Sequence, residues 1–120
     1  MPDSIPLRGG ELNAAITREV IRVHSDSHGR GPKKAFTVHN GNVVITVLEE
    51  VLSPAERKLV GGGESEAVLK MRQLYQRGMG PELKQSVETL TQRRVTAFMS
   101  DNHVEPDMAV EIFILDQPLG

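Results

Sequence analysis

The sequence has no cysteine and no tryptophan, and its only aromatic residues are three phenylalanines and one tyrosine. Without cysteine the chain forms no disulfide, no thiolate nucleophile and no cysteine metal site. Few side chains are available to stack on the bases of single-stranded nucleic acid. A formal net charge of −2 also argues against a broad nucleic-acid surface, which needs cations. Composition therefore gives no strong nucleic-acid signal, and an RNA-binding module is the least favoured binding function.

Long apolar runs are also missing. No stretch approaches the roughly 20 apolar residues needed to cross a bilayer, so we expect no direct membrane insertion. The opening "MPDSIPLRGG" lacks the charged start and apolar run of a secretory signal. We therefore expect a cytoplasmic protein. With 120 residues and 38% apolar content, it should form one ordinary core: a flexible leader (1–9), a single domain (10–117) and a tail (118–120).

Helical periodicity runs from about Gly10 to Ser27, where apolar residues recur every three or four positions. Gly29 then offers a natural end to that helix, because glycine adopts the left-handed conformation without a Cβ clash. The next stretch, "KAFTVHNGNVVITVLEE", predicts a β-hairpin. Asn40–Gly41 suits a type I′ turn, which would place Val38 opposite Val43 and Phe36 opposite Ile45 on one apolar face. The other face is only half polar: Thr37, Val44, Thr46 and Leu48.

"SPAE" predicts the start of a second helix, because Ser53 and Glu56 can form a capping box around Pro54. The glycines at 61–63 interrupt it after about two turns. We expect a third helix over Glu64–Arg77 and, after "GMGP", a fourth over Pro81–Thr91. The predicted buried side of the third helix consists of Val68, Met71, Leu74 and Tyr75.

Two final strands are predicted over Arg94–Ser100 and Met108–Leu115, joined by "DNHVEPD". The order α-β-β-α-α-α-β-β predicts a two-layer α+β domain with a largely antiparallel four-stranded sheet and helices packed on it. The strand order within the sheet stays open. In the last strand Val110, Ile112 and Ile114 point one way, while Phe113 and Leu115 point the other. Because a sheet that is apolar on both faces needs two covers, either helices cover both sides or a second subunit covers one. We favour a homodimer.

Several segments together resemble the MpsC-like family, a small bacterial domain: "GRGPKK", "VLSPAERKLV", "GPELKQSVETLTQRRV" and "SDNH…VEIFIL". The resemblance covers about residues 8–116. The family is named after a sodium-translocating, membrane-potential-generating system whose membrane components resemble inorganic-carbon uptake machinery. The resemblance implies a bacterial accessory domain, singly or in tandem, that partners a membrane transport protein and has no established catalytic residue. This chain departs from the pattern at Gly61–Gly63, at Gly80, where an arginine often precedes the proline, and at Gln92–Arg93, where a glycine commonly ends the helix.

"GRGPKK" is the first candidate site. Backbone N–H groups around its glycines, with three cations nearby, would suit a small anion such as phosphate or bicarbonate: Gly29, Arg30, Gly31, Lys33 and Lys34. The spacing is not that of a P-loop. The stretch also follows a helix C-terminus, whose partial negative charge attracts cations and repels anions. A helix stop followed by a turn is thus the competing interpretation, and the favoured one.

His24 and His28 lie four residues apart on one helix face, which suits two metal ligands. A third ligand would have to come from His39 or His103. Since histidine near a helix C-terminus is favourable without a metal, we expect no metal and no cofactor.

Glu111 is the carboxylate of most interest, because its strand is apolar on both sides. If buried, it must be paired or protonated, and Arg94 on the neighbouring strand is the candidate partner. We interpret this as a structural ion pair, with a general base in a pocket as the alternative. No "GxSxG" or comparable pattern occurs. The sequence therefore favours a non-catalytic, dimerising accessory domain, with a small-anion or nucleotide sensor at Gly29–Lys34 as the alternative.

Overall fold

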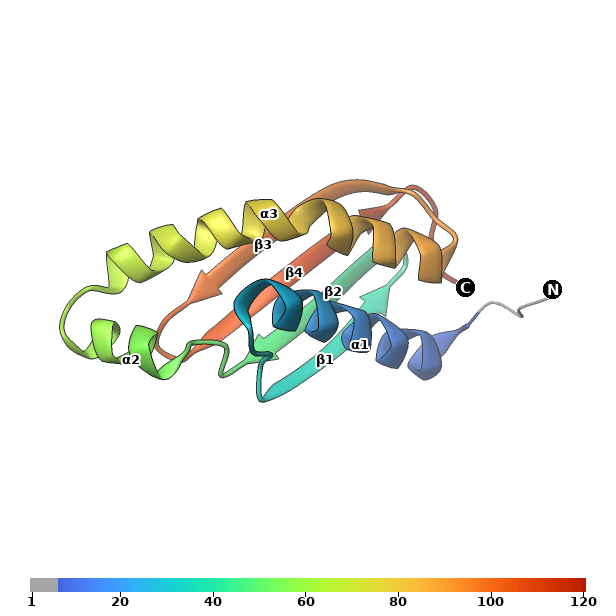
Figure 1. Cartoon of the computed structure of the whole chain (residues 1–120). Coiled ribbons are helices and arrows are strands. Elements are labelled where there is room, and N and C mark those ends of the chain that lie inside the picture. The colour runs from blue at the N-terminus through green and yellow to red at the C-terminus, as the bar shows by residue number, and fades with distance from the viewer. Residues whose placement is uncertain (1–6) are drawn as a thin grey trace.

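A computed structural model describes residues 7–120 and shows an antiparallel sheet with its helices on one face (Figure 1). The class, α+β in two layers, is as predicted. The elements are α1 (Gly9–His28), β1 (Lys34–Asn40), β2 (Val43–Glu49), α2 (Pro54–Gly61), α3 (Ser65–Thr91), β3 (Val95–His103) and β4 (Met108–Leu115). Most of the predicted leader, residues 1–6, lies outside the described part of the chain.

The strands lie in the order β1-β2-β4-β3, and every neighbouring pair is antiparallel. The two hairpins therefore meet through β2 and β4, which leaves β1 and β3 at the edges. α1 and α3 pack side by side across one face of this sheet, while α2 joins β2 to α3 (Figure 1). The buried core lies between these two layers and is aliphatic apart from one phenylalanine: Leu12, Ile16, Val20, Val23, Val44, Leu48, Val51, Leu52, Val68, Met79, Leu83, Val87, Ala109, Phe113 and Leu115.

The first hairpin is present, but its register differs from the prediction. Val38 pairs with Ile45 rather than Val43, because Val43 pairs with Asn40. The two central turn residues are Gly41 and the residue after it, and Gly41 alone of the two has a positive φ, 60°. That is the pattern of a type II′ turn rather than type I′. Since the partner moves by two positions, each side chain stays on its predicted face.

The predicted helix signals are confirmed at two ends. Gly29 terminates α1 with a φ of 76°, and its N–H donates to the Ser25 carbonyl at 2.8 Å. At the start of α2 the Ser53 hydroxyl accepts from the Glu56 N–H at 3.1 Å, and the Glu56 carboxylate accepts from the Ser53 N–H at 2.8 Å. Both ends thus satisfy backbone groups that a helix leaves unpaired.

The break predicted at "GMGP" is wrong, because α3 runs through it with Pro81 inside the helix. A proline in a helix interior removes one i→i−4 hydrogen bond and typically costs about 3 kcal/mol. Burial outweighs that cost here, since one continuous stripe of residues is buried along both halves: Val68, Arg72, Gln76, Met79, Gly80, Leu83, Val87 and Thr91. Tertiary packing therefore overrides the local signal.

The buried side predicted for the first half of α3 is also wrong. Arg72 and Gln76 are buried, with 4% and 9% of their surface exposed, whereas Leu74 is 64% exposed. Met71 and Tyr75 are likewise exposed. The rotation has a physical cause, because Arg72 turns inward to bind the carboxylate of the α2 capping box. Of the residues expected inside, Val68 alone is buried.

The third strand is longer than predicted. β3 begins at Val95, one residue later than expected, and continues past Ser100 to His103, which pairs with Met108. A bulge between Val95 and Ala97 interrupts its start. The loop that follows is correspondingly short, residues 104–107.

The end of α3 generates a stability prediction. Gln92 occupies the C-cap with a φ of 55°, a left-handed conformation that side chains with a Cβ disfavour. We expect Gln92→Gly to raise the free energy of unfolding by about 0.5–1 kcal/mol, because glycine relieves that strain. Urea denaturation measures it. Gln85→Gly, an exposed position inside α3, should instead lower stability by about 1 kcal/mol. A Gln92→Gly variant no more stable than the parent would contradict the argument.

Candidate functional site

The first candidate is the sheet face that carries no helix, here called the open face. Its side chains alternate along each strand with those that face the helices, which are buried mainly in β2 and β4. Phe36, Val38 and Met99 are about half exposed, at 49%, 49% and 50%. The central strands add six partly exposed aliphatic residues: Val43, Ile45, Val47, Val110, Ile112 and Ile114. A contiguous apolar surface of this kind is unusual on a monomer and marks an interaction site.

The covered face, by contrast, contains a row of polar side chains. The hydroxyls of Thr17, Thr37 and Thr46 form a chain from α1 across β1 to β2, with oxygen–oxygen distances of 2.7 and 2.8 Å. Thr46 pairs with Glu111 on β4, and Glu111 pairs with Ser100 on β3. The Ser100 hydroxyl donates to Glu111 Oε1 at 2.8 Å. The sequence placed Thr37 and Thr46 on this face but did not predict that helices would cover this face rather than the other.

Glu111 lies at the centre of that row and is fully buried, 0% exposed. Its Oε1 lies 3.5 Å from His24 Nε2, and its Oε2 has no hydrogen-bond partner among the described residues. The His24 Nδ1–H donates to the Val20 carbonyl at 2.8 Å, because a carbonyl only accepts. Nε2 therefore bears a proton only in the imidazolium.

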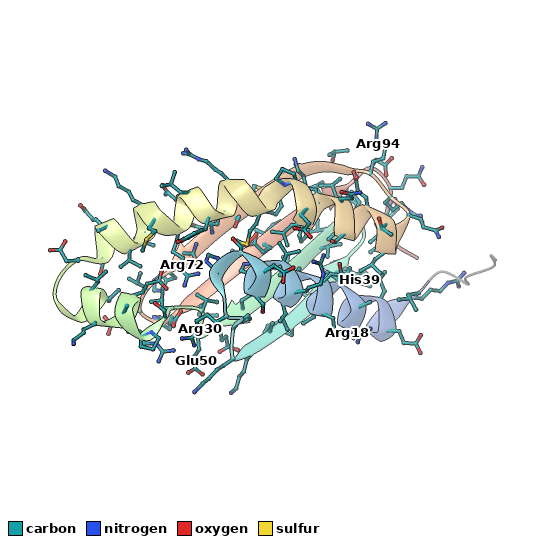
Figure 2. All side chains as sticks on the ribbon, viewed as in Figure 1. Arg18, Arg30, His39, Glu50, Arg72 and Arg94 are labelled. Carbon is teal, nitrogen blue, oxygen red and sulfur yellow. The ribbon has the colours of Figure 1, made fainter. Side chains whose placement is uncertain are left out.

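The expected ion pair between Glu111 and Arg94 does not form. Arg94 precedes β3, its N–H donates to Asp116 Oδ1 at 3.1 Å, and its side chain points away from the protein (Figure 2). Opposite Glu111 on β3 lies Ser100 instead. Glu111 is thus buried, which is the condition under which the sequence required a partner, but Arg94 lies outside β3 and is not that partner.

A second buried cluster joins α2 to α3. Arg72 Nε donates to Glu56 Oε2 at 2.9 Å, and Arg72 Nη2 donates to the Val51 carbonyl at 2.7 Å. Although burial raises the pKa of Glu56, hydrogen bonds from Arg72 and Ser53 outweigh it and hold that pKa below its usual value. Removing one partner of such a pair would leave a buried charge alone. The role of the Arg72–Glu56 pair is therefore structural, because the pair holds α2 against α3.

The histidines do not converge on one point. The ring centroids of His24 and His28 lie 5.9 Å apart, and His28 packs edge-on against Tyr75 at 4.5 Å. His39 hydrogen-bonds to the Asn13 side chain at 2.7 Å, in the first half of α1. His103 Nδ1 donates to the Pro106 carbonyl at 2.8 Å. Over residues 7–120, no three histidine or acidic side chains group as metal ligands do.

The glycines of the Gly29–Lys34 loop have structural roles. A Cβ on Gly31 would lie 2.7 Å from Ser25 Oγ, so this position allows the loop to pack closely on α1. The Lys33 N–H donates to the Glu49 carbonyl at 3.1 Å and continues the β1–β2 ladder. Arg30, which lies near the end of α1 (Figure 2), is half-buried, and its Nε has no partner within the described chain. The loop thus ends a helix and begins a strand, and anion binding there stays a prediction.

Comparison with known proteins gives one finding. Residues 8–117 match the model of the family described as "Na+-translocating membrane potential-generating system (MpsC)". No curated protein and no solved structure matches the chain. Among the helices of residues 7–120, none has both the length and the apolar character required to span a bilayer.

His28 generates a pH prediction. Burial first, and then the charges of Arg72 and His24, lower its pKa to about 4, while Glu56 opposes the shift. The unfolded chain protonates this group near its ordinary value of about 6.5. The part of the folding free energy that depends on neutral His28 is therefore fully present above pH 6.5 and is lost as the pH falls toward 4. Since the ring is half-buried, solvent screening reduces the effect to about 1 kcal/mol.

Urea denaturation between pH 7 and pH 4 tests this. We expect the loss of stability over that range to be about 1 kcal/mol smaller in His28→Gln than in the parent. The matched control is His103→Gln, because His103 is exposed and should keep the parental slope. Equal pH slopes in His28→Gln and the parent would show that His28 does not cause the effect.

Proposed function

Because the chain belongs to the MpsC family, we propose that it is a non-catalytic accessory or regulatory domain that dimerises and partners a membrane transport system. The observation that carries the proposal is the open face. An enzyme would need a cleft with convergent reactive groups, whereas the open face presents exposed and partly exposed apolar side chains. We place the domain in the cytoplasm, as the sequence analysis expects.

A second copy of the chain is the occupant that the open face fits best. Charged side chains lie only at the margins of the open face. Lys34 and Glu49 lie opposite each other in the strand register at one end, and Asp101 lies on the edge strand β3. The interior of the face is apolar, so it is complementary to itself about a two-fold axis. Two antiparallel sheets packed in this way form a sandwich with interdigitating aliphatic side chains.

The area of the open face is consistent with such a dimer. Its strands are 7 to 9 residues long. At roughly 3.3 Å per residue and roughly 4.8 Å between strands, four of them cover roughly 450 Å². Two faces then remove roughly 900 Å² before side-chain relief is counted, close to the roughly 1,000 Å² expected of a biological interface.

We predict that Val38→Lys and Met99→Lys together convert the dimer to a monomer. Both side chains are half exposed in the single chain, so the variant should fold normally. In the dimer each ammonium would be buried without a partner, which should raise the dimer Kd at least about a hundredfold. Sedimentation velocity over a dilution series measures this. Leu74→Lys is the matched control, because Leu74 is 64% exposed on α3, away from the sheet. A parent chain that remains monomeric, or a control that also dissociates, would overturn the proposed interface.

The transport partner is supported by the family description alone, which names a Na+-translocating system. We expect crosslinking in native cells, with a photoreactive residue at exposed Leu59 or Leu74, to recover a membrane transport protein. A residue at buried Val44 provides the background. Repeated recovery of no membrane component, or equal recovery from all three positions, would remove the transport link and leave the dimer untouched.

A small-anion or nucleotide sensor at Gly29–Lys34 is the alternative function. Its supporting observation is that Arg30 Nε, close in sequence to the exposed Lys33 and Lys34, has no hydrogen-bond partner among residues 7–120. Against it, the glycines already have structural roles. Amide NMR titration with phosphate, bicarbonate and nucleotides separates the two. Saturable shifts centred on this loop and absent in Arg30→Ala would favour the sensor, and the accessory-domain account expects none.

A further inference from the structure

A groove of about 560 Å³ runs between α3 and the edge strand β3, on the helical side of the sheet. It is called here the α3–β3 groove, and the residues that matter in it are Gln76, Arg77, Lys84, Phe98 and Ser100. It lies on the opposite side of the sheet from the open face, so a dimer through that face leaves it free. α3 accompanies β3 along this edge of the sheet (Figure 1).

The floor of the groove contains an unsatisfied donor. Gln76 is nine-tenths buried and lines the groove, yet its Nε2 has no hydrogen-bond partner among residues 7–120. A buried amide donor without an acceptor is destabilising, and native proteins nearly always satisfy one. Beside it the ring of Phe98 packs on Phe113, with ring centroids 5.2 Å apart, and close to Gly80 of α3. The floor therefore offers an apolar ring and a free N–H to an incoming carbonyl or carboxylate.

The wall of the groove is cationic. Arg77 and Lys84 lie seven positions apart on α3, so they project from the same side of the helix about 10 Å apart. No carboxylate in the described part of the chain pairs with either. Arg22 on α1, by contrast, forms ion pairs with three carboxylates, those of Glu19, Asp26 and Glu82. The charge at the groove thus complements an acidic ligand.

The remaining side of the groove is a free strand edge. β3 is an edge strand of 9 residues without lysine, arginine or proline. Natural sheets usually protect such edges with those residues, because unpaired N–H and C=O groups template another strand. The other edge has that protection, since Pro32, Lys33 and Lys34 stand at the start of β1. The bulge in β3 disturbs only its beginning, between Val95 and Ala97.

We propose that the α3–β3 groove binds an extended, acidic peptide segment of a partner protein, which adds to the sheet as a strand beside β3. The backbone of the peptide pairs with β3, one of its acceptors takes the Gln76 Nε2–H, and its carboxylates face Arg77 and Lys84. This names the chemistry of the partner and so rests on the proposed accessory role. It does not depend on dimerisation.

Fluorescence anisotropy with the full chain tests it. The probe is a labelled peptide long enough to pair with the 9 residues of β3, in which glutamate alternates with valine. The matched probe has lysine in place of each glutamate. We expect saturable binding of the glutamate peptide alone, with amide NMR shifts and slowed hydrogen exchange along Ala97–His103.

Arg77→Glu with Lys84→Glu should weaken binding roughly tenfold. Arg18→Glu with Arg8→Glu, the same charge change on and next to α1, should not.

Gln76→Met separates recognition from structure. The two side chains have similar shapes, so removing the unsatisfied amide should raise the stability of the free protein while binding of the glutamate peptide falls several-fold. No binding, equal binding of both peptides, or shifts on the open face would overturn the groove as a peptide site. Displacement of the peptide by inorganic phosphate at equal concentration would also overturn it, and would indicate a small-anion site instead. In each case the oligomeric state, measured separately, still decides the proposed dimer.

Discussion

The structure depends on one constraint: α1 and α3 lie on the same side of a four-stranded sheet that carries apolar side chains on both faces. Burial of aliphatic side chains is the main force that holds α1 and α3 on the sheet. The same force acts on the opposite face, which no helix or strand of residues 7–120 covers. The order of the elements along the described chain therefore leaves one face of the sheet, the open face, without a covering layer.

Polar groups inside the helical layer determine how α3 is oriented. Arg72 turns inward to the carboxylate of Glu56, which places Gln76 one turn later on the same buried side. That rotation exposes Leu74, and it leaves the Gln76 amide nitrogen beside β3 without a hydrogen-bond partner in the described part of the chain. The buried ion pair between Arg72 and Glu56 thus explains two features of α3. Apolar side chains lie on its exposed side, and the amide donor of Gln76 lies in the α3–β3 groove without an acceptor among the described residues. Glu111, held by Ser100 and next to His24, belongs to the same layer but to a separate cluster.

Local sequence signals predicted what local chemistry controls. The glycine end at Gly29 and the capping box at Ser53 depend on a few neighbouring residues, and both are present. Alternation in β4 placed Glu111 on the same face as Phe113 and Leu115, and that face is the buried one. What failed depends on distant contacts. The continuity of α3 through Pro81 needs the packing of both helix halves, and the inward Arg72 needs Glu56, sixteen residues earlier. The partner of Glu111 could not be read from the sequence because the length of β3 sets it. The unpaired Gln76 left no sequence signal, since a glutamine at a buried helical position looks like any exposed one.

The most direct test of this account is whether open faces contact each other in solution. Intermolecular NOEs, measured on an equal mixture of methyl-labelled and unlabelled protein, report such contacts without altering the chain. The account predicts NOEs from the methyl groups of Ile45 and Ile112 to a second copy, and a mass near twice 13.2 kDa. The account would be contradicted by a mass of 13.2 kDa together with the absence of intermolecular NOEs, at protein concentrations where the methyl signals of Ile45 and Ile112 are strong.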